Sequence, residues 1–478
     1  MTASISIPLW VFIFLLVVTT WAILDLVFIP SVRWFLRRRI NLVLKEIGSR
    51  LDIEIRPFQV TKRQVLIDRL VYDHHIIKAT AIKAAEENMP REAIQAEILG
   101  YAREIVPSFN AYLYFRLGYW IAKKVAKLLY GVRVGLVDNE ELEKVDPNST
   151  VVFVMNHRSN MDYILVAFLA AERTTLSYAV GEWARIWPLH TLIRSMGAFF
   201  VRRNSGNPLY RLVLERYIQM ATKEGVCQAV FLEGGLSRDG RLRNPKFGLV
   251  DYMLRGFNNE EDRDIVFIPV GLNYDRTLED RSLVRSLDST AKRRSKWFVF
   301  RTTLGFIWHN LILMAFNKWH RFGYACVNFG PCMSMKDFCR KRGIRFQRIG
   351  KEERFPVVEE LCGQLMSSIK RIVPVLPISV VARTLLDYSD EWLSAFEVNG
   401  HIYHLIEDLL ARGAPLYVPQ RGWDKAISIA FNMVRLRHMV KESDGKFQAD
   451  PDSLDILLYY ANSISQWMGG EEPRDTAE

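Results

Sequence analysis

The chain has 478 residues, of which 49% are hydrophobic and 24% are charged. This composition is typical of a globular protein and excludes a disordered chain, and the length is enough for two or three domains. The net charge of +11 favours an anionic partner, either nucleic acid, an acidic membrane surface or a phosphorylated substrate. The five cysteines form no CxxC pair, which indicates a reducing environment and not a disulfide framework.

The amino-terminal segment is the strongest feature of the composition. Residues 1–24 carry no charged side chain, and residues 8–30 are apolar except for Asp25. About 20 helical residues cross a bilayer core, and the arginines of residues 33–39 place this end in the cytoplasm by the positive-inside rule. We therefore expect residues 1–32 to form a single-pass anchor in the cytoplasmic (inner) membrane, with the rest of the chain on the cytoplasmic side. A buried or interfacial helix is the alternative, because Asp25 shortens the apolar run.

Residues 33–130 are expected to form a helical region. Apolar residues follow Pro90 at spacings of three and four residues, which is the pattern of a helix with one buried face. Residues 110–128 add a second helix that is rich in aromatic residues and lysines. This helix either packs on the domain that follows or lies on a membrane, and the sequence leaves both open.

From residue 131 to residue 374 short β-rich runs alternate with helical ones. The runs at residues 151–157, 229–235 and 265–274 are apolar and end in polar residues or glycine. This pattern predicts an α/β domain with a mostly parallel sheet, buried on both faces and flanked by crossover helices. Ligand sites in such sheets lie at the carboxyl ends of the strands.

The carboxyl-terminal half contains three further segments. Residues 295–325 are apolar but flanked by basic residues. They are expected to lie on the membrane surface or to line a groove for an acyl chain, and a core helix is the alternative. Residues 375–467 are expected to form a helical region. The tail, residues 468–478, is expected to be disordered.

The segment NHRSNMD, residues 156–162, carries the first candidate for catalysis. His157 and Asp162 follow a strand-like run and open a helix. At such a turn the carboxylate can fix the tautomer of the imidazole, whose other nitrogen becomes a base. The spacing alone is weak, since a helix start capped by Ser159 or Asn160 has the same pattern.

Three further segments carry candidate ligands for an anion. GAFFVRRN places Arg202 and Arg203 after an apolar run, and paired arginines often simply face solvent. VFIPV has Pro269 at the expected end of a strand, where it would shape a pocket wall. FLEGGLSRDGRL ends a strand at a glycine-rich turn that would bring backbone and arginine to a phosphate, or else forms a plain hairpin. Its candidate residues are Glu233, Gly234, Gly235, Ser237 and Arg238, with Lys246 shortly after.

In order and spacing, HRSNMDY, GAFFVRR, FLEGGLSR and IPV resemble the four motif blocks of the bacterial and mitochondrial glycerol-3-phosphate acyltransferases. The resemblance implies the glycerolipid acyltransferase fold, with His157 as general base and Asp162 orienting it. It further implies that glycerol-3-phosphate is bound by Arg202, Arg203 and the residues of the third block, and that Pro269 is the proline of the fourth. The chain departs from the family at Leu236, where an arginine is usual, and at Asn160, where a histidine is frequent.

The resemblance implies transfer of a fatty acyl group from acyl-CoA or acyl carrier protein to the 1-hydroxyl of glycerol-3-phosphate, without metal or other cofactor. Lysophosphatidate and dihydroxyacetone phosphate are the alternative acceptors. Backbone N–H groups of the first block or of the Gly-Gly loop are expected to hold the oxyanion.

Two alternative functions belong to a different class, namely a non-catalytic membrane adaptor and a nucleic-acid binder. No zinc or RNA-binding motif supports the latter, so nucleic acid is not expected as a partner. His401 and His404, on one helix face, suggest surface packing more than metal binding.

Overall fold

The computed structural model describes most of the chain beyond residue 55. The described residues are 56–111, 113–135, 144–170, 176–181, 189–202, 205–288, 322–417 and 422–469. The predicted anchor, Arg203, nearly all of residues 295–325 and nearly all of the tail lie outside these ranges. Across the described ranges, every helix is too short or too polar to span a bilayer.

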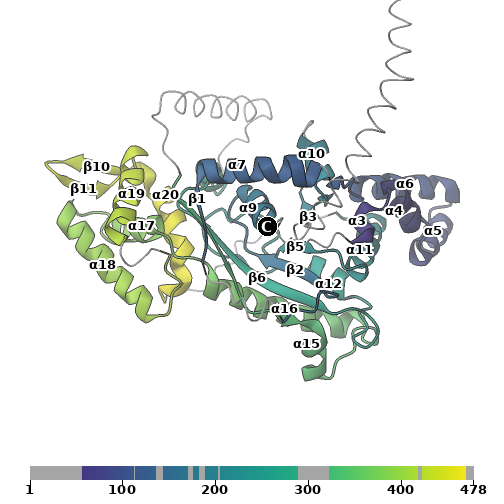
Figure 1. The fold of residues 1–478 in the computed structure, drawn as a ribbon. Helices are drawn as coiled ribbons and strands as arrows, with labels where there is room; N and C mark the ends of the chain where they lie inside the picture. The colour runs from purple at the N-terminus through teal and green to yellow at the C-terminus, as the bar shows by residue number, and fades with distance from the viewer. Residues whose placement is uncertain are drawn as a thin grey trace, which may run out of the picture.

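The molecule is elongated, with a helical region at one end, a sheet in the middle and a second helical region at the other end (Figure 1). The first region precedes the sheet in the chain. Its helices are α3 (Pro57–Val60), α4 (Arg63–Val71), α5 (His74–Glu86) and α6 (Arg91–Ile105), followed by a π-helical turn (Leu113–Gly118) and α7 (Tyr119–Leu129). Helix α5 begins where the side chain of Asp73 accepts a hydrogen bond from the backbone of His75.

The central sheet has the strand order β1-β7-β6-β2-β5-β3-β4, with β8 paired to β6. Its strands are β1 (Gly131–Val134), β2 (Thr150–Met155), β3 (Ser177–Val180), β4 (Phe199–Phe200), β5 (Gln228–Phe231), β6 (Ile265–Tyr274), β7 (Tyr324–Phe329) and β8 (Met333–Ser334). Strands β6, β2, β5, β3 and β4 are mutually parallel, while β7 and β8 run antiparallel to β6. The predicted α/β class with a mostly parallel sheet is therefore confirmed.

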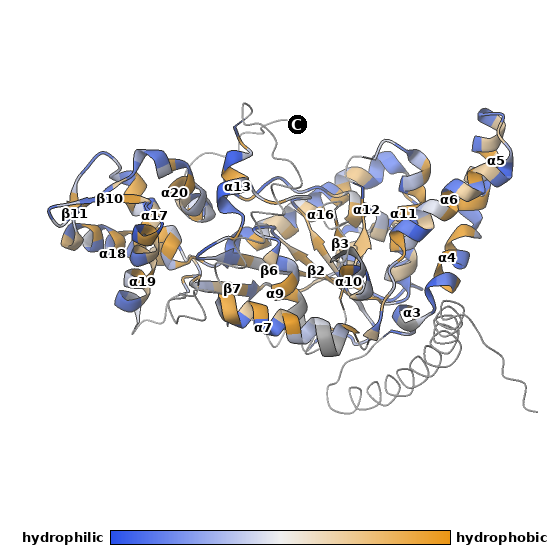
Figure 2. Ribbon diagram, turned by 90° about the horizontal axis from the view of Figure 1, so that it is seen from above, coloured by the Kyte–Doolittle hydropathy of each residue, from blue (hydrophilic) through white to orange (hydrophobic). Residues whose placement is uncertain are grey.

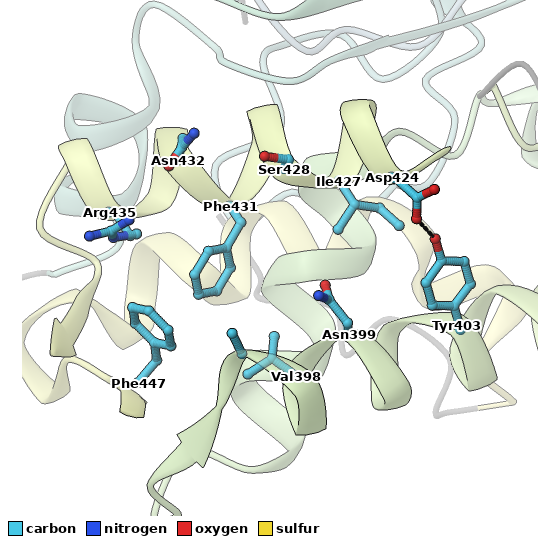
Figure 3. A pocket seen from close by; sticks show the side chains of 11 residues that line it. Val398, Asn399, Tyr403, Asp424, Ile427, Ser428, Phe431, Asn432, Arg435 and Phe447 are labelled. Atoms are coloured by element: carbon cyan, nitrogen blue, oxygen red, sulfur yellow. Dashed lines mark hydrogen bonds between the residues drawn. The ribbon is translucent and has the colours of Figure 1, made fainter. Parts of the chain in front are cut away.

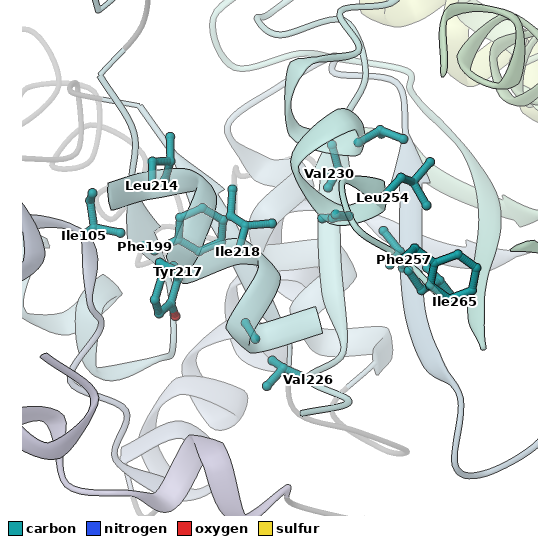
Figure 4. Packing of buried hydrophobic residues seen from close by; sticks show 14 of the residues in the cluster. Ile105, Phe199, Leu214, Tyr217, Ile218, Val226, Val230, Leu254, Phe257 and Ile265 are labelled. Carbon is teal, nitrogen blue, oxygen red and sulfur yellow. The ribbon is translucent and has the colours of Figure 1, made fainter. Parts of the chain in front are cut away.

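Helices cover both faces of the sheet, which explains why all ten residues of β6 are buried. The helices of this part are α9 (Met161–Ala170), α10 (Leu189–Ser195), α11 (Pro208–Lys223), α12 (Gly248–Leu254), α13 (Asp280–Arg285), α15 (Met335–Arg342) and α16 (Lys351–Ile372). Helices α11, α12 and α16 bury the larger apolar cluster on one face, part of which Figure 4 shows around Phe199, Ile218 and Leu254. Helix α9 packs on the other face, with α7 outside it.

The expectation that Pro269 ends a strand is wrong. Pro269 lies inside β6, where it pairs with Val154 of β2. On its other side β6 changes partner, from β8 at Phe267 to β7 at Val270. The carbonyl of Pro269 accepts a hydrogen bond from Gly330 across that junction, at 2.8 Å. Because no ladder donor is needed at the junction, the missing N–H of proline is tolerated there.

The carboxyl-terminal region is not purely helical, which corrects the prediction for residues 375–467. Its helices are α17 (Pro377–Asp387), α18 (Ala395–Ala411), α19 (Trp423–Leu436) and α20 (Leu454–Ala461). They pack with a three-stranded antiparallel sheet of β9 (Leu393–Ser394), β10 (Val440–Ser443) and β11 (Lys446–Ala449). The β10–β11 turn is Asp444-Gly445, and both residues have positive φ, as a tight hairpin turn requires.

Candidate active site

The carboxyl ends of β2 and β5 bring the first and third motif blocks together. The last residues of these two strands, Met155 and Phe231, are register partners in the parallel ladder. The chain therefore leaves both strands at the same edge of the sheet, where α/β proteins place their ligand sites. Asn156 fixes the first exit, since its side chain exchanges two hydrogen bonds with the backbone of Leu272 in β6, at 2.9 and 2.8 Å.

His157 and Asp162 are in contact. The Nδ1 atom of His157 lies 2.8 Å from Oδ2 of Asp162, and both side chains are buried. The same carboxylate oxygen accepts hydrogen bonds from the backbone N–H groups of Arg158 and Ser159, at 2.8 and 3.0 Å. The other oxygen accepts one from the hydroxyl of Tyr274, at 2.7 Å.

This arrangement determines the tautomer of His157. An ionised carboxylate only accepts hydrogen bonds, so Nδ1 must donate its proton to Asp162. The Nε2 atom then carries the free lone pair of a base. It has no hydrogen-bond partner among the described residues. Burial and the negative charge of Asp162 raise the pKa of Tyr274 well above its usual value, which keeps its hydroxyl protonated as a donor.

Aromatic rings fix the plane of the imidazole. The ring of Phe231, at the end of β5, stacks on His157 with centroids 3.9 Å apart and an interplanar angle of 25°. The ring of Tyr163 meets His157 edge-on, with centroids 5.5 Å apart. Both contacts restrict rotation of a side chain that is only 2% exposed, so the base is held in place by packing as well as by hydrogen bonding.

Glu233 supports the histidine and does not face a ligand. Its Oε1 atom accepts a hydrogen bond from the backbone of His157 at 3.0 Å, and Oε2 accepts one from the backbone of Arg243 at 3.2 Å. The side chain is 1% exposed. Burial raises the pKa of Glu233 to about 8, although both hydrogen bonds favour the charged form. A role in joining the two motif loops therefore fits its geometry better than contact with glycerol-3-phosphate.

The glycine-rich loop carries the exposed cations. Gly234 has a φ of +64°, and the aliphatic stem of Lys246 lies where a side chain at residue 234 would be. Lys246 and Arg238 are exposed, and neither has an ion-pair or hydrogen-bond partner for its side chain among the described residues. Gly235 is buried. Both cations are therefore free to bind an anion beside the His157 loop.

Ser237 is a structural residue of the same loop. It is fully buried, its backbone N–H donates to the carbonyl of His157 at 3.0 Å, and its hydroxyl donates to the carbonyl of Arg241 at 2.7 Å. The hydroxyl also accepts from the backbone of Gly240 at 3.0 Å. These bonds leave Ser237 to shape the loop and not to bind substrate.

Arg202 is not joined to the site. It follows β4, which is separated from β2 by β5 and β3, so three strand spacings of about 4.8 Å place it roughly 14 Å from the end of β2. Its guanidinium makes two hydrogen bonds to Glu104, at 2.8 and 2.6 Å, and lies over the rings of Tyr101 and Tyr210. To bind a phosphate, Arg202 would have to leave this carboxylate.

Several residues of the site were not found from the sequence. Tyr274 ends an apolar strand, and nothing in that pattern indicates contact with Asp162. Arg158 is also buried: its Nη1 donates to the carbonyl of Gly240, and its guanidinium lies 4.9 Å from the ring centroid of Tyr459. Leu236, where the resemblance to the family predicts an arginine, packs against the apolar cluster of the carboxyl-terminal region.

A separate pocket of about 260 Å³ lies in the carboxyl-terminal region, between α18, α19 and β11 (Figure 3). Val398, Ile427, Phe431 and Phe447 form its apolar part, and a hydrogen bond from Tyr403 to Asp424 closes one side. None of the predicted site residues lines it. His401 of α18 stacks on Tyr388, with centroids 4.0 Å apart, in agreement with a packing role.

Two family models match different parts of the chain. The Acyltransferase family model matches residues 136–273, and the model of the glycerol-3-phosphate acyltransferase C-terminal region matches residues 311–468. The curated glycerol-3-phosphate acyltransferases of Pseudomonas entomophila (strain L48) and Ectopseudomonas mendocina (strain ymp) are 29% and 30% identical over 339 residues, which is 69% of this chain. That of Xanthomonas axonopodis pv. citri (strain 306) is 28% identical over 359 residues, or 73% of the chain. The match spans 39% of the length of each relative.

A solved structure also aligns with the chain. The crystal structure of the 1-acyl-sn-glycerophosphate (LPA) acyltransferase PlsC from Thermotoga maritima covers 64% of this chain and 95% of its own, with a TM-score of 0.31 and 15% sequence identity.

Proposed function

Because the chain belongs to the glycerol-3-phosphate acyltransferase family, we propose that it transfers a fatty acyl group from an acyl thioester to the 1-hydroxyl of glycerol-3-phosphate. The product is lysophosphatidic acid. The observation that supports this chemistry best is the buried contact of His157 with Asp162, which leaves Nε2 as a base with no partner among the residues that the structure describes. A substrate hydroxyl is the nucleophile that such a pair activates.

The reaction begins when Nε2 of His157 accepts the proton of the 1-hydroxyl as its oxygen attacks the thioester carbonyl. The tetrahedral intermediate collapses, the C–S bond breaks, and the imidazolium returns the proton to the leaving thiolate. Asp162 stabilises the imidazolium that forms between these steps. Tyr274 and two backbone donors hold that carboxylate in place.

The oxyanion is held by the Gly-Gly loop and not by the first block. The backbone N–H groups of residues 157–161 are all engaged, by Glu233, Asp162, Glu279 and the hydroxyl of Ser159. The N–H groups of Gly235 and Leu236 have no partner among the described residues. These two donors lie two and three residues after Glu233 and are suited to the charge that develops on the carbonyl oxygen.

Arg238 and Lys246 bind the phosphate of the acceptor. Both are exposed and have no side-chain partner within the described part of the chain, and both lie on the loop that Glu233 ties to His157. Charge-assisted contacts of this kind contribute roughly 1.5–3 kcal/mol each. The donor is acyl-CoA or acyl carrier protein, both of which are acidic and match the net charge of +11. The predicted anchor at residues 1–32 holds the enzyme at the cytoplasmic face of the inner membrane, where the product is used.

An assay with purified full-length protein tests the acceptor. Glycerol-3-phosphate, dihydroxyacetone phosphate and lysophosphatidate are offered separately, each with acyl-CoA and with acyl carrier protein as donor. The expected result is the highest kcat/KM with glycerol-3-phosphate. A higher value with either other acceptor would contradict the assignment of the acceptor, and no transfer to any acceptor would support a non-catalytic adaptor.

A further inference from the structure

Helix α7 packs on the protein through two alanines, together with Val125 and Leu129. Ala122 and Ala126, four residues apart, are 4% and 1% exposed and lie against Ile164 of α9. Figure 1 shows α7 along the upper edge of the molecule, with α9 between it and the sheet. The helix begins after a π-helical turn and ends at Leu129, and the N–H of the next residue, Tyr130, still bonds to the carbonyl of Ala126. An alanine face allows close packing but buries little apolar surface.

Two bulky apolar residues of α7 nevertheless face outward. Trp120 is 56% exposed and Leu128 is 44% exposed. Lys124 and Lys127 are exposed as well, and the positions 120, 124, 127 and 128 fall on one face of a helix. A helix that covers a protein core normally keeps tryptophan and leucine on its inner face. The outer face of α7 is therefore built for contact with something other than this domain.

The charge on this face has one sign. Helix α7 contains no aspartate or glutamate, and the side chains of Lys124 and Lys127 have no partner among the described residues. The next strand, β1, continues the same character with exposed Arg133 and with Val134, which is 44% exposed. Lysines bordering a tryptophan and a leucine are the composition of helices that lie in the interface of a bilayer.

We propose that the outer face of α7, formed by Trp120, Lys124, Lys127 and Leu128, docks on an anionic bilayer surface. Tryptophan favours the headgroup level of a bilayer, and lysine is attracted to anionic lipid within a Debye length. The sequence left open whether residues 110–128 pack on the domain that follows or lie on a membrane. On this proposal the inner face of α7 packs on the domain and the outer face lies on the membrane. This contact is separate from the predicted anchor and from the reaction at His157, and it holds even if the acceptor assignment fails.

The position of α7 connects this contact to the site. Helix α7 packs on α9, and α9 begins at Met161, within the turn that carries His157 and Asp162. A membrane contact through α7 is therefore only one helix away from the catalytic pair, and it orients that pair relative to the lipid surface into which the acyl product is released.

The test uses the full chain on vesicles with an environment-sensitive fluorophore at one introduced cysteine. Cys332, the one native cysteine that is partly exposed within the described residues, is first replaced by serine. Leu128→Cys reports on α7, and Leu410→Cys, on α18, is the matched control because its exposure of 52% is similar. Quenching by nitroxide lipid is measured in vesicles of phosphatidylcholine with phosphatidylglycerol, and of phosphatidylcholine alone.

The expected result is quenching at residue 128 at least twofold stronger than at residue 410 in the anionic vesicles, and weaker in the neutral ones. Lys124→Glu with Lys127→Glu should lower quenching at residue 128 to the level of residue 410, with the circular dichroism spectrum unchanged. Equal quenching at residues 128 and 410 in anionic vesicles overturns the proposal. It is also overturned if residue 128 is shielded from an aqueous quencher without vesicles, because a protein segment then covers α7.

Discussion

The catalytic histidine is held by more contacts than its motif reveals. The motif contributes Asp162, but the orientation of this carboxylate depends on Tyr274, which lies 112 residues further along the chain. The stacking ring, Phe231, comes from a third segment. His157 is therefore preorganised by β2, β5 and β6 together, and not by its own turn alone.

Removing the hydroxyl of Tyr274 tests this support. Tyr274→Phe keeps the ring but deletes one hydrogen bond to a charged group, which is worth about 1.5 kcal/mol at the low end of the usual range. We expect kcat to fall roughly tenfold with the KM for glycerol-3-phosphate unchanged. Steady-state kinetics of the two proteins measure this directly. An unchanged kcat would show that the backbone donors alone orient Asp162.

Leu236 gives a second test at this scale. The residue packs against the carboxyl-terminal apolar cluster, so Leu236→Arg places a charge in an apolar contact. We expect the free energy of unfolding to fall by about 1–3 kcal/mol, without a lower KM for glycerol-3-phosphate. Denaturant unfolding and kinetics check both parts. A lower KM at unchanged stability would mean that the family's arginine binds phosphate here too.

Among the elements, helix α20 is the one that connects the carboxyl-terminal region to the site. Tyr459 donates a hydrogen bond to the carbonyl of Arg158 at 3.3 Å, and Asn462, just after the helix, donates to the carbonyl of Asp239 at 2.8 Å. A side chain at Gly240 would lie 1.9 Å from the carbonyl oxygen of Tyr459. The loops of the first and third blocks thus rest on α20.

Gly240→Ala tests this contact, and Gly256→Ala is its control. Both glycines have positive φ, +87° and +79°, but only at Gly240 would the new methyl group meet another atom. The control should lose about 1 kcal/mol of stability from backbone strain alone. Gly240→Ala should lose more and should also lower kcat at least tenfold. Equal effects of the two substitutions on kcat would argue against a role for α20 in positioning the loops.

Elements that rest on local chemistry were predictable, and those that rest on tertiary pairing were not. The short apolar runs that alternate with helical segments in the sequence predicted β2, β5 and β6 close to their observed bounds. The hairpin of β10 and β11 was missed, although Asp444-Gly445 between alternating residues is a direct signal for it. The place of Pro269 inside β6 was not predictable, because it depends on where β8 gives way to β7.

In the site, too, local contacts were predictable from the sequence and tertiary contacts were not. The pairing of His157 with Asp162 follows from their spacing at a strand end, but the support of Glu233 for the backbone of His157 requires the register of β2 and β5. The engagement of Arg202 by Glu104 joins residues 98 apart, so sequence alone offered no reason to remove it from the phosphate ligands.

At the scale of the whole molecule, two buried carboxyl groups make stability depend on pH. Burial raises the pKa of Glu233 to about 8 and that of Asp275 to about 7. Asp275 joins the start of β7 to the start of α17, through the backbone N–H groups of Tyr324 and Ile378 at 2.7 and 3.3 Å. Asp275 therefore links the sheet to the carboxyl-terminal region, whereas Glu233 links two loops of the site.

The sign of the effect follows from linkage. Because the folded-state pKa of each carboxyl is raised above its unfolded value, its contribution to stability is fully present below the unfolded pKa. The contribution is lost as the pH rises through about 7 for Asp275 and about 8 for Glu233. We expect the melting temperature to fall progressively as the pH rises from about 4, near the unfolded pKa values of 3.8 and 4.5, to about 8, and to fall less in a variant with Asp275→Asn and Glu233→Gln. Parallel melting curves for the two proteins would contradict these shifts.

The role of His157 as the base is tested most directly by comparing His157→Ala with His404→Ala in the purified protein. His404 is exposed on α18 and is the control for loss of an imidazole. The rate of acyl transfer to glycerol-3-phosphate should fall by about 10²–10⁴-fold in His157→Ala and stay unchanged in His404→Ala, with matching circular dichroism spectra. A His157→Ala protein that transfers the acyl group within a few-fold of the unaltered rate would contradict the assignment of His157 as the base.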